Sequence, residues 1–430
     1  MNGNKRITHY IKEVCGQIKN KEVHAAIRLE LENHFAEKIE DYREAGYGED
    51  EATRIAIAEM GDPVAVGQQL HQAHKPRMEW SILSIVGVML AIGLLTIYSL
   101  QIVPDQRNLI GRQLVGILMG SVIFVGILFW DYSKLKRYSQ LLYFSTLILL
   151  LYTLLEGSLK NRIPGLHFGG VSLDFITISP FLLILALAGI FTTWKENNRN
   201  TLVKTIAYFL PPCLLFVLAE YEFTVLLYVI SYIVLVIATK PTKLAVLSFL
   251  AVVFASVGGM FYLFGKPHQL DILIYYLDPY LEPDGRGYTI IQSLKTIKSA
   301  NLWGQGFGSS VDTLHALESD FIFTYMVYLF GPIAGIAFFL LGVVLLVRFV
   351  HSIRRVKDLY GSMLLSGMLV LFFTPFFWSI FMTVGLVPPV PVSLPFVGFG
   401  IVHTVLHLSL LGLALNIYRR KDIQPLIKVS

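Results

Sequence analysis

Two patterns of hydrophobic and polar positions divide the chain near residue 78. Before that point, apolar residues recur at every fourth position of charged segments. The stretch 24–45 shows this spacing at Ile27, Leu31, Phe35 and Ile39. Such a period predicts an amphipathic helix that buries one face. After residue 78, long apolar runs alternate with short polar connections, which is typical of membrane-spanning helices.

Residues 1–78 are predicted to form a small cytoplasmic helical bundle. Gly46 and Gly48 end the first clear helix, and the acidic run 49–51 begins a second. Gly61-Asp62-Pro63 interrupts the second helix, and a third runs from Val64 to about His74. Three or four helices therefore pack together. The sequence leaves open whether this domain is a solvated tether or a docking or sensing module.

A membrane domain is predicted over residues 79–421, followed by a cytoplasmic tail, 422–430. Its ten apolar runs are long enough to cross the hydrocarbon layer, and backbone groups in lipid must pair internally, so each run is expected to be a helix. The runs cover 80–102, 110–130, 138–155, 174–194, 203–219, 223–239, 244–264, 320–347, 359–384 and 393–417. The fold class is thus all-α and polytopic.

Lysines and arginines gather in alternate connections, which sets the expected orientation. Basic residues follow the second, eighth and tenth runs, among them Lys134, Lys136, Arg137, Arg348, Arg354, Arg355, Lys357, Arg419, Arg420 and Lys421. By the positive-inside rule this side faces the cytoplasm. Both termini are then cytoplasmic, in agreement with an even number of spans in a bacterial plasma-membrane protein.

Composition excludes a wholly soluble protein. Of the 430 residues, 54% are hydrophobic and 15% are charged, whereas soluble domains carry about a quarter charged residues. The two cysteines, Cys15 and Cys213, offer neither a disulfide framework nor a cysteine metal site. Because the first 78 residues contain no short apolar core, we expect no cleaved signal peptide.

The connection 265–319 is several times longer than the others and is expected on the outer side. Connections of this length are usually functional or disordered, and the apolar positions in 288–297 favour a segment at the membrane interface. Gly304, Gly306 and Gly308 permit tight turns or a close approach to a ligand. As a phosphate-binding signature, "GQGFG" is weak because no strand precedes it.

Several motifs in the last third of the chain are similar to those of one family. "GYTIIQS" is followed by "LWGQGFGSSV" and then by "DFIF", which opens a long apolar run. "DPYLEPDGRGY" and "GLVPPVPVSLPF" fit the same family's proline and glycine pattern. Together these stretches resemble the SEDS family of FtsW, RodA and SpoVE. The first 78 residues resemble helical prefix domains fused ahead of membrane proteins in Gram-positive bacteria.

The resemblance implies a peptidoglycan glycosyltransferase that polymerises lipid II, an undecaprenyl-diphosphate-linked precursor, into glycan strands at the outer face of the cytoplasmic membrane. It implies a class B penicillin-binding protein as partner and a role in cell shape, division or sporulation. We expect no nucleic-acid partner. The family's essential acidic residue precedes a Phe-Ile-Phe-type helix start, so the matching position is Asp320.

Physical chemistry gives Asp320 two roles, which the sequence does not separate. A carboxylate in the first turn of a helix is a good N-cap and is favoured by the helix dipole. A general base for the acceptor hydroxyl needs an ionised carboxylate within hydrogen-bond reach, and the helix N-terminus is expected to keep Asp320 ionised.

The departing diphosphate needs positive charge. The candidate substrate-binding residues are Arg286, Gln292, Ser293, Lys295, Lys298 and Glu318. The lysines are equally explained by ordinary positions at the membrane interface. A divalent cation, Mg2+ or Mn2+, is a candidate cofactor, although the sequence shows no protein metal site.

Other positions depart from the family pattern. Glu220 and Glu222 stand where a Gln-Pro-Asp-like motif is expected, and they are either substitutes or without a role.

His403 and His407 share one face of the tenth run. Hydrogen bonding between helices explains that pair better than a metal site, although ionisable residues inside spans are functional suspects.

Four functions stay open at this stage. The chain is a lipid II polymerase, a catalytically weak scaffold that binds and regulates a penicillin-binding protein, a transporter of the lipid-linked precursor, or a membrane sensor. An Asp320 carboxylate that faces a cavity favours the first.

Overall fold

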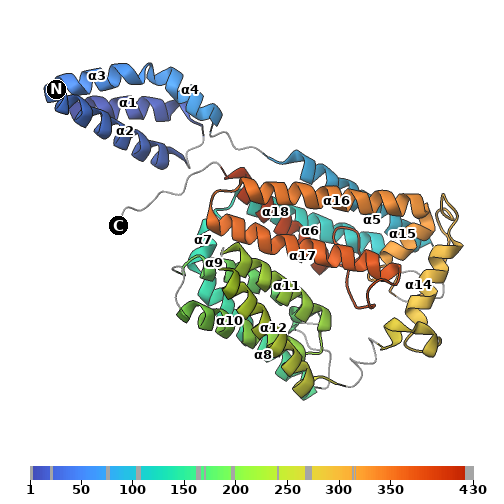
Figure 1. Cartoon of the computed structure of the whole chain (residues 1–430). Coiled ribbons are helices and arrows are strands. Elements are labelled where there is room, and N and C mark those ends of the chain that lie inside the picture. The colour runs from blue at the N-terminus through green and yellow to red at the C-terminus, as the bar shows by residue number, and fades with distance from the viewer. Residues whose placement is uncertain are drawn as a thin grey trace. The chain divides into compact units, whose positions relative to one another are not determined.

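The computed structural model describes residues 3–19, 23–73, 78–102, 108–160, 166–168, 171–194, 199–239, 242–266, 274–311, 314 and 316–421 (Figure 1). The predicted tail 422–430 and His74 lie outside these residues. The chain divides into two compact units. One consists of Met1–Glu79, Arg355–Asp358 and Ile417–Ser430, and the other of Trp80–Arg354 and Leu359–Asn416.

Four helices form the N-terminal bundle: α1 (Gly3–Gln17), α2 (His24–Glu44), α3 (Glu49–Met60) and α4 (Pro63–Ala73). The four-residue period of α2 buries Ile27, Leu31 and Phe35, and the ring of Phe35 meets that of Tyr10 edge to face at 5.4 Å. Gly46 and Gly61 have positive φ angles where α2 and α3 end. Glycine meets this conformational demand without the steric cost that a Cβ atom brings.

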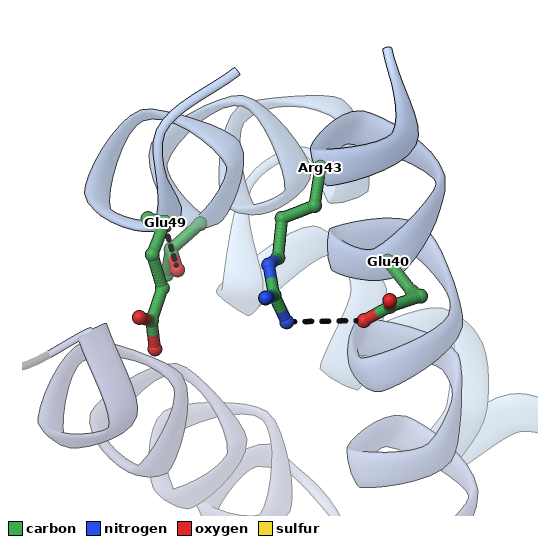
Figure 2. A network of polar contacts seen from close by, with 4 residues as sticks. Glu40, Arg43 and Glu49 are labelled. Carbon is green, nitrogen blue, oxygen red and sulfur yellow. Dashed lines mark hydrogen bonds and ion pairs between the residues drawn. The ribbon is translucent and has the colours of Figure 1, made fainter. Parts of the chain in front are cut away.

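Exposed charges follow the outer faces of α2 and α3. Arg43 donates to the carboxylate of Glu40 at 3.2 Å, one turn earlier in α2. Figure 2 shows this pair, with Glu49 of α3 on the other side of the arginine. More than half of each paired side chain is exposed, so the pair adds little stability. The packed apolar stripe therefore holds the bundle together.

The second unit contains the apolar helices. In the described residues, seven helices are long and apolar enough to cross a membrane, and three apolar helices are shorter. The seven are α5 (Trp80–Ile102), α6 (Leu109–Phe129), α8 (Ser139–Lys160), α12 (Lys243–Phe264), α16 (Pro332–Arg355), α17 (Leu359–Thr383) and α18 (Ile401–Arg419). The shorter three are α9 (Phe175–Phe191), the apolar part Val203–Leu218 of α10 (Arg199–Leu218), and α11 (Glu222–Ala238). The predicted polytopic helical fold is confirmed.

Two small elements were not expected from the sequence. A short helix, α7 (Ser133–Arg137), precedes α8, and an antiparallel pair of three-residue strands, β1 (Leu166–Phe168) and β2 (Val171–Leu173), precedes α9. Neither could be predicted from periodicity, since each spans five residues or fewer. The strand pair leads the chain into Asp174 at the start of α9, which packs against α8, α11 and α17.

The eighth apolar run is not one helix, contrary to the prediction of 320–347. It consists of α15 (Ile322–Phe330) and α16, and the break lies at Gly331-Pro332. Gly331 has a φ of 88°, and a Cβ there would lie 2.2 Å from the carbonyl oxygen of Leu302. Because Pro332 lacks an N–H and Gly331 closely approaches another backbone segment, the helix ends there.

Residues 301–309, which we call the glycine loop, cover that break. The N–H groups of Gln305 and Gly306 donate to the carbonyl oxygens of Tyr328 and Leu329 at 2.9 and 3.2 Å. These carbonyls belong to the last turn of α15, where intrahelical partners run out. "GQGFG" therefore completes a helix end in this structure, which gives its glycines a structural reason.

Residues 384–400, which we call the proline segment, connect α17 to α18. The predicted tenth run begins at 393, but α18 begins at Ile401. Four prolines lie in the segment, and Phe396 has a φ of 68°. Proline removes helical hydrogen bonds, so the chain stays non-helical here. Such backbone is tolerated at membrane depth only where protein buries it or a cavity adjoins it.

Candidate functional site

One cavity of about 420 Å3 lies within the membrane unit, lined by residues of helices and of the turns between them. Its walls come from the start of α9, the α10–α11 turn, the turn before α15, the proline segment and α18. Its polar and ionisable lining residues are Asp174, Thr177, Glu220, Tyr221, Glu222, Thr224, Ser319, Asp320, Ser393, His403 and His407. We call this space the Asp320 cavity.

Asp320 lies in a turn, two residues before α15 begins. The carbonyl oxygen of Ala316 accepts hydrogen bonds from the N–H groups of Ser319 and Phe321, and Ala316 has a φ of 55°. The N-cap residue of α15 is Phe321, without a side-chain cap. The predicted N-cap role of Asp320 is therefore wrong, because the helix starts one residue too late for it.

Burial governs the charge of Asp320. Desolvation raises the pKa of its carboxyl from 3.8 to about 6, and the nearby charge of Glu318 acts in the same direction. A hydrogen bond with the Ser319 side chain acts the other way. Burial therefore opposes the expected effect of the helix end, and this carboxyl is harder to ionise than an ordinary aspartate. A carboxylate with a pKa near 6 is suited to accept a proton near neutral pH.

The turn that carries Asp320 is tied to the proline segment. The N–H of Phe399 donates to the carbonyl oxygen of Glu318 at 2.8 Å. Gln113 of α6 is buried and holds the same segment from the other side. Its amide nitrogen donates to Gly398 and Thr404 at 3.4 and 3.1 Å, and its oxygen accepts from the N–H of Gly400 at 3.2 Å.

The other carboxylates of the cavity have local structural partners. Asp174 caps α9, since its oxygens accept from the N–H and hydroxyl of Thr177 at 3.1 and 2.6 Å. Glu220 forms an ion pair with Lys266 and has a φ of 63° at the end of α10. Glu222 lies in the first turn of α11, where negative charge is favourable.

Both histidines of α18, His403 and His407, line the cavity. The sequence alone did not assign either of them a catalytic role. A side-chain nitrogen of His407, Nδ1, lies 2.7 Å from the carbonyl oxygen of His403. His407 is buried, and its Nε2 has no hydrogen-bond partner among the described residues. The spacing of four residues correctly placed both side chains on one face.

Arg112 is a cation that the sequence did not single out. Its guanidinium carbon lies 5.5 Å from the ring centre of Phe399, whose side chain lines the cavity. Lys266, paired with Glu220, brings a second positive charge to another wall. Since these residues are distant in sequence from Asp320, no local motif could have associated them with it.

Five of the predicted substrate-binding residues lie on the long connection, away from the lining of this cavity. Lys295 and Lys298 are exposed on α14 (Tyr288–Ser299), and Arg286 is exposed, with its guanidinium 5.3 Å from the ring centre of Tyr275. The Ser293 hydroxyl donates to the carbonyl oxygen of Thr383 at 2.9 Å, and the Gln292 carbonyl oxygen accepts from Thr296. The sixth, Glu318, adjoins Asp320.

A divalent cation bound by protein alone needs several donor side chains close together. Within the described part of the chain, no group of three or more histidine, cysteine, aspartate or glutamate side chains is placed to hold a metal ion. Asp174 and Glu220 already have partners. These residues do not fit a protein-only metal centre.

A family comparison shows to which protein family this chain belongs. Residues 75–423 match the model of the FtsW/RodA/SpoVE family, described as cell cycle protein. The chain belongs to the FtsW/RodA/SpoVE family. The matched range includes every helix from α5 to α18, so it covers the membrane unit with its cavity.

Named relatives of this family share about a quarter of the residues. The chain is 26% identical over 347 residues to stage V sporulation protein E of Bacillus subtilis, covering 77% of this chain and 94% of that protein. It is 26% identical over 391 residues to the peptidoglycan glycosyltransferase RodA of Treponema pallidum, covering 72% and 90%.

Solved structures share the fold. A chain from a peptidoglycan synthase complex, described for its coordination of polymerization and crosslinking, matches with a TM-score of 0.65 and 20% identity over 80% of this chain and 98% of that one. RodA of Thermus thermophilus, a rod shape determining protein, matches with a TM-score of 0.58 and 19% identity over 80% and 97%. At these identities the likeness establishes the fold alone.

Proposed function

We propose that this chain is a peptidoglycan glycosyltransferase that polymerises lipid II. The observation that carries the proposal is the Asp320 carboxylate, which lines a cavity of about 420 Å3 and has a pKa raised to about 6 by burial. Family membership adds support, because several FtsW/RodA/SpoVE relatives are named peptidoglycan glycosyltransferases.

Asp320 is the general base in this proposal. The acceptor sugar hydroxyl gives its proton to the carboxylate while its oxygen attacks the anomeric carbon of the donor. A new glycosidic C–O bond forms, the bond between the anomeric carbon and the diphosphate oxygen breaks, and the polyprenyl diphosphate departs with the electron pair. A carboxyl with a pKa near 6 is largely ionised at pH 7 and can still hold the proton it accepts.

Positive charge near the leaving group comes from Arg112 in this scheme. Its guanidinium lies over Phe399, at the wall that Asp320 shares through the Glu318–Phe399 hydrogen bond. A cation placed where negative charge develops stabilises the transition state. Arg286, Lys295 and Lys298, which lie on the long connection, stay candidates for binding the lipid-linked substrate before it reaches the cavity.

The proposal includes a topology and a partner. The basic side of the membrane unit is cytoplasmic, so both termini are cytoplasmic and the Asp320 cavity opens outward. A class B penicillin-binding protein is the partner, supported by the fold shared with a chain of a peptidoglycan synthase complex. The process served is cell shape, division or sporulation.

Purified full-length protein given lipid II, with and without a candidate transpeptidase, tests the proposal. Glycan strands from wild type that disappear in Asp320→Asn are expected. Asp41→Asn is the matched control, since it removes an exposed carboxylate of α2 that lies outside the cavity lining. Wild type without strands under every partner would favour the scaffold. Translocation of lipid II across liposomes that survives Asp320→Asn, without strands, would favour the transporter.

A further inference from the structure

We propose that His407 binds the saccharide part of the substrate by accepting a hydrogen bond from a sugar hydroxyl or acetamido N–H at its Nε2. This inference rests on the proposed function and assigns a second polar contact to the Asp320 cavity. It arises from a buried imidazole in α18 that lines the cavity and from an unused nitrogen on that imidazole.

The tautomer of His407 follows from its one hydrogen bond. Nδ1 lies 2.7 Å from the carbonyl oxygen of His403. A carbonyl oxygen only accepts, so Nδ1 carries the hydrogen and donates it. In neutral imidazole the other nitrogen is then an acceptor with a free lone pair. The structure therefore presents Nε2 as an acceptor, which selects a donor group on the ligand.

Three aromatic rings fix the orientation of this imidazole. The ring centres of Phe396, Phe372 and Phe181 lie 5.7, 5.9 and 6.1 Å from that of His407. Phe181 also lines the cavity. An imidazole held by rings on several sides and by a hydrogen bond to its own helix has little freedom to turn. Its acceptor is thus positioned before a ligand arrives.

An unpaired buried acceptor is costly, which gives the arrangement a reason. The exposed fraction of His407 is 4%, and no described residue supplies a partner for Nε2. A buried polar atom without a hydrogen bond lowers stability, and native proteins pair most of them. A leucine in this aromatic surrounding would avoid that cost. In the proposal, a ligand donor in the cavity supplies the missing partner once the side chains that cover Nε2 make room for it.

Binding can be separated from turnover in an Asp320→Asn background. In that background, the dissociation constant for lipid II is measured with full-length protein in nanodiscs, for His407→Leu, His407→Gln and the control His351→Leu. His351 is exposed on α16 and lies outside the cavity lining. Loss of the acceptor is expected to weaken binding about tenfold. Glutamine, which keeps a polar atom at similar reach, is expected to restore most of it, and His351→Leu to change nothing.

Kinetic and spectroscopic measurements complete the test. In protein that keeps Asp320, His407→Leu is expected to raise KM for lipid II with a smaller change in kcat. In 15N-histidine-labelled protein, lipid II is expected to shift the Nε2 resonance of His407, assigned by its absence from the His407→Gln spectrum. Because the resonance is measured with His407 in place, this test does not depend on whether the His407→Leu variant folds.

Each outcome has a defined meaning. Equal affinity and KM in well-folded His407→Leu, or an unmoved Nε2 resonance at saturating lipid II, overturns the inference and leaves the proposed function intact. Wild type that neither binds nor polymerises lipid II overturns both.

Discussion

The backbone N–H of Phe399 and the carbonyl oxygen of Glu318 are 2.8 Å apart, which joins the proline segment to the turn that carries Asp320. On its other side the proline segment is held by Gln113 of α6. The position of the carboxylate therefore depends on three segments that are far apart in sequence. Preorganised catalytic groups need such supporting contacts.

Gln113→Leu is expected to reduce polymerisation, because it removes the contacts to Gly398, Gly400 and Thr404. Unpaired buried groups there would cost about 1–3 kcal/mol of stability. Gln101→Leu is the matched control, since Gln101 accepts a hydrogen bond from the N–H of Ile110 and, among the described residues, has no hydrogen bond to the proline segment. Glycan synthesis and thermal unfolding in detergent are measured for both. Equal loss of activity in the two variants would contradict the supporting role of Gln113.

The pKa of Asp320 predicts a pH dependence of the reaction. The base works when ionised, so kcat/KM should fall as pH falls through about 6, well above the ordinary aspartate value of 3.8. Asp320→Asn should lower the rate about 10²-fold or more at pH 7. A rate unchanged down to pH 4.5 would argue against Asp320 as the base.

Folding stability should change with pH in the opposite sense. The raised pKa means that the contribution of Asp320 to stability is fully present below about 3.8 and is lost as pH rises through about 6. Asp320→Asn is therefore expected to stabilise the protein at pH 7, by roughly 1–3 kcal/mol, and to have no such effect near pH 3.5. Denaturation midpoints at the two pH values check the sign.

Arg112 and the lysine pair Lys295 and Lys298 are alternative binding groups for the diphosphate, and substitutions distinguish between them. Arg112→Ala is expected to raise KM for lipid II about tenfold, because its guanidinium adjoins a wall of the cavity. Lys295→Ala with Lys298→Ala is expected to change it less than about threefold, since both side chains are exposed on α14. Arg354→Ala is the control. If KM rises strongly in the lysine variants and not in Arg112→Ala, the lysines bind the diphosphate, as predicted from the sequence, and Arg112 does not.

Periodicity and run length predicted most of the helices, because burial in a bundle or in lipid leaves a regular pattern in the sequence. The stripe of Ile27, Leu31 and Phe35 became the buried face of α2. Hydrophobicity does not reveal the helix boundaries that backbone geometry determines. Gly331-Pro332 divides an apolar run into two helices, and the prolines of the proline segment delay α18 to Ile401.

The candidate site was only partly accessible to sequence reasoning. A motif singled out Asp320, but motifs describe neighbours along the chain. Arg112 and Gln113 come from α6, and His407 comes from α18, so only folding brings them to the same region. Ser293 illustrates the reverse case. It belongs to a recognised motif, yet its hydroxyl binds Thr324 and Thr383 inside the protein.

Gly331→Ala should destabilise the protein by more than about 2 kcal/mol, because it combines a positive φ with a Cβ placed 2.2 Å from the Leu302 carbonyl oxygen. Gly306→Ala is a matched comparison. Gly306 has nearly the same φ, 84°, but an added Cβ meets no atom within 4 Å, so only the conformational cost of about 1–2 kcal/mol applies. Equal unfolding midpoints for the two variants would show that the close backbone approach adds nothing.

Phe35→Ala tests whether the N-terminal bundle folds independently of the membrane unit. Phe35 is 1% exposed and packs edge to face on Tyr10, so truncation should cost about 3–5 kcal/mol, enough to unfold a small bundle. Hydrogen exchange on the full-length protein should then lose protection in α1 to α4 and keep it in α9 and α17. Glu37→Ala, on an exposed position of α2, is the control and should leave both regions protected. If protection in α9 and α17 falls together with that of the bundle, the two units unfold cooperatively, and independent folding of the bundle is excluded.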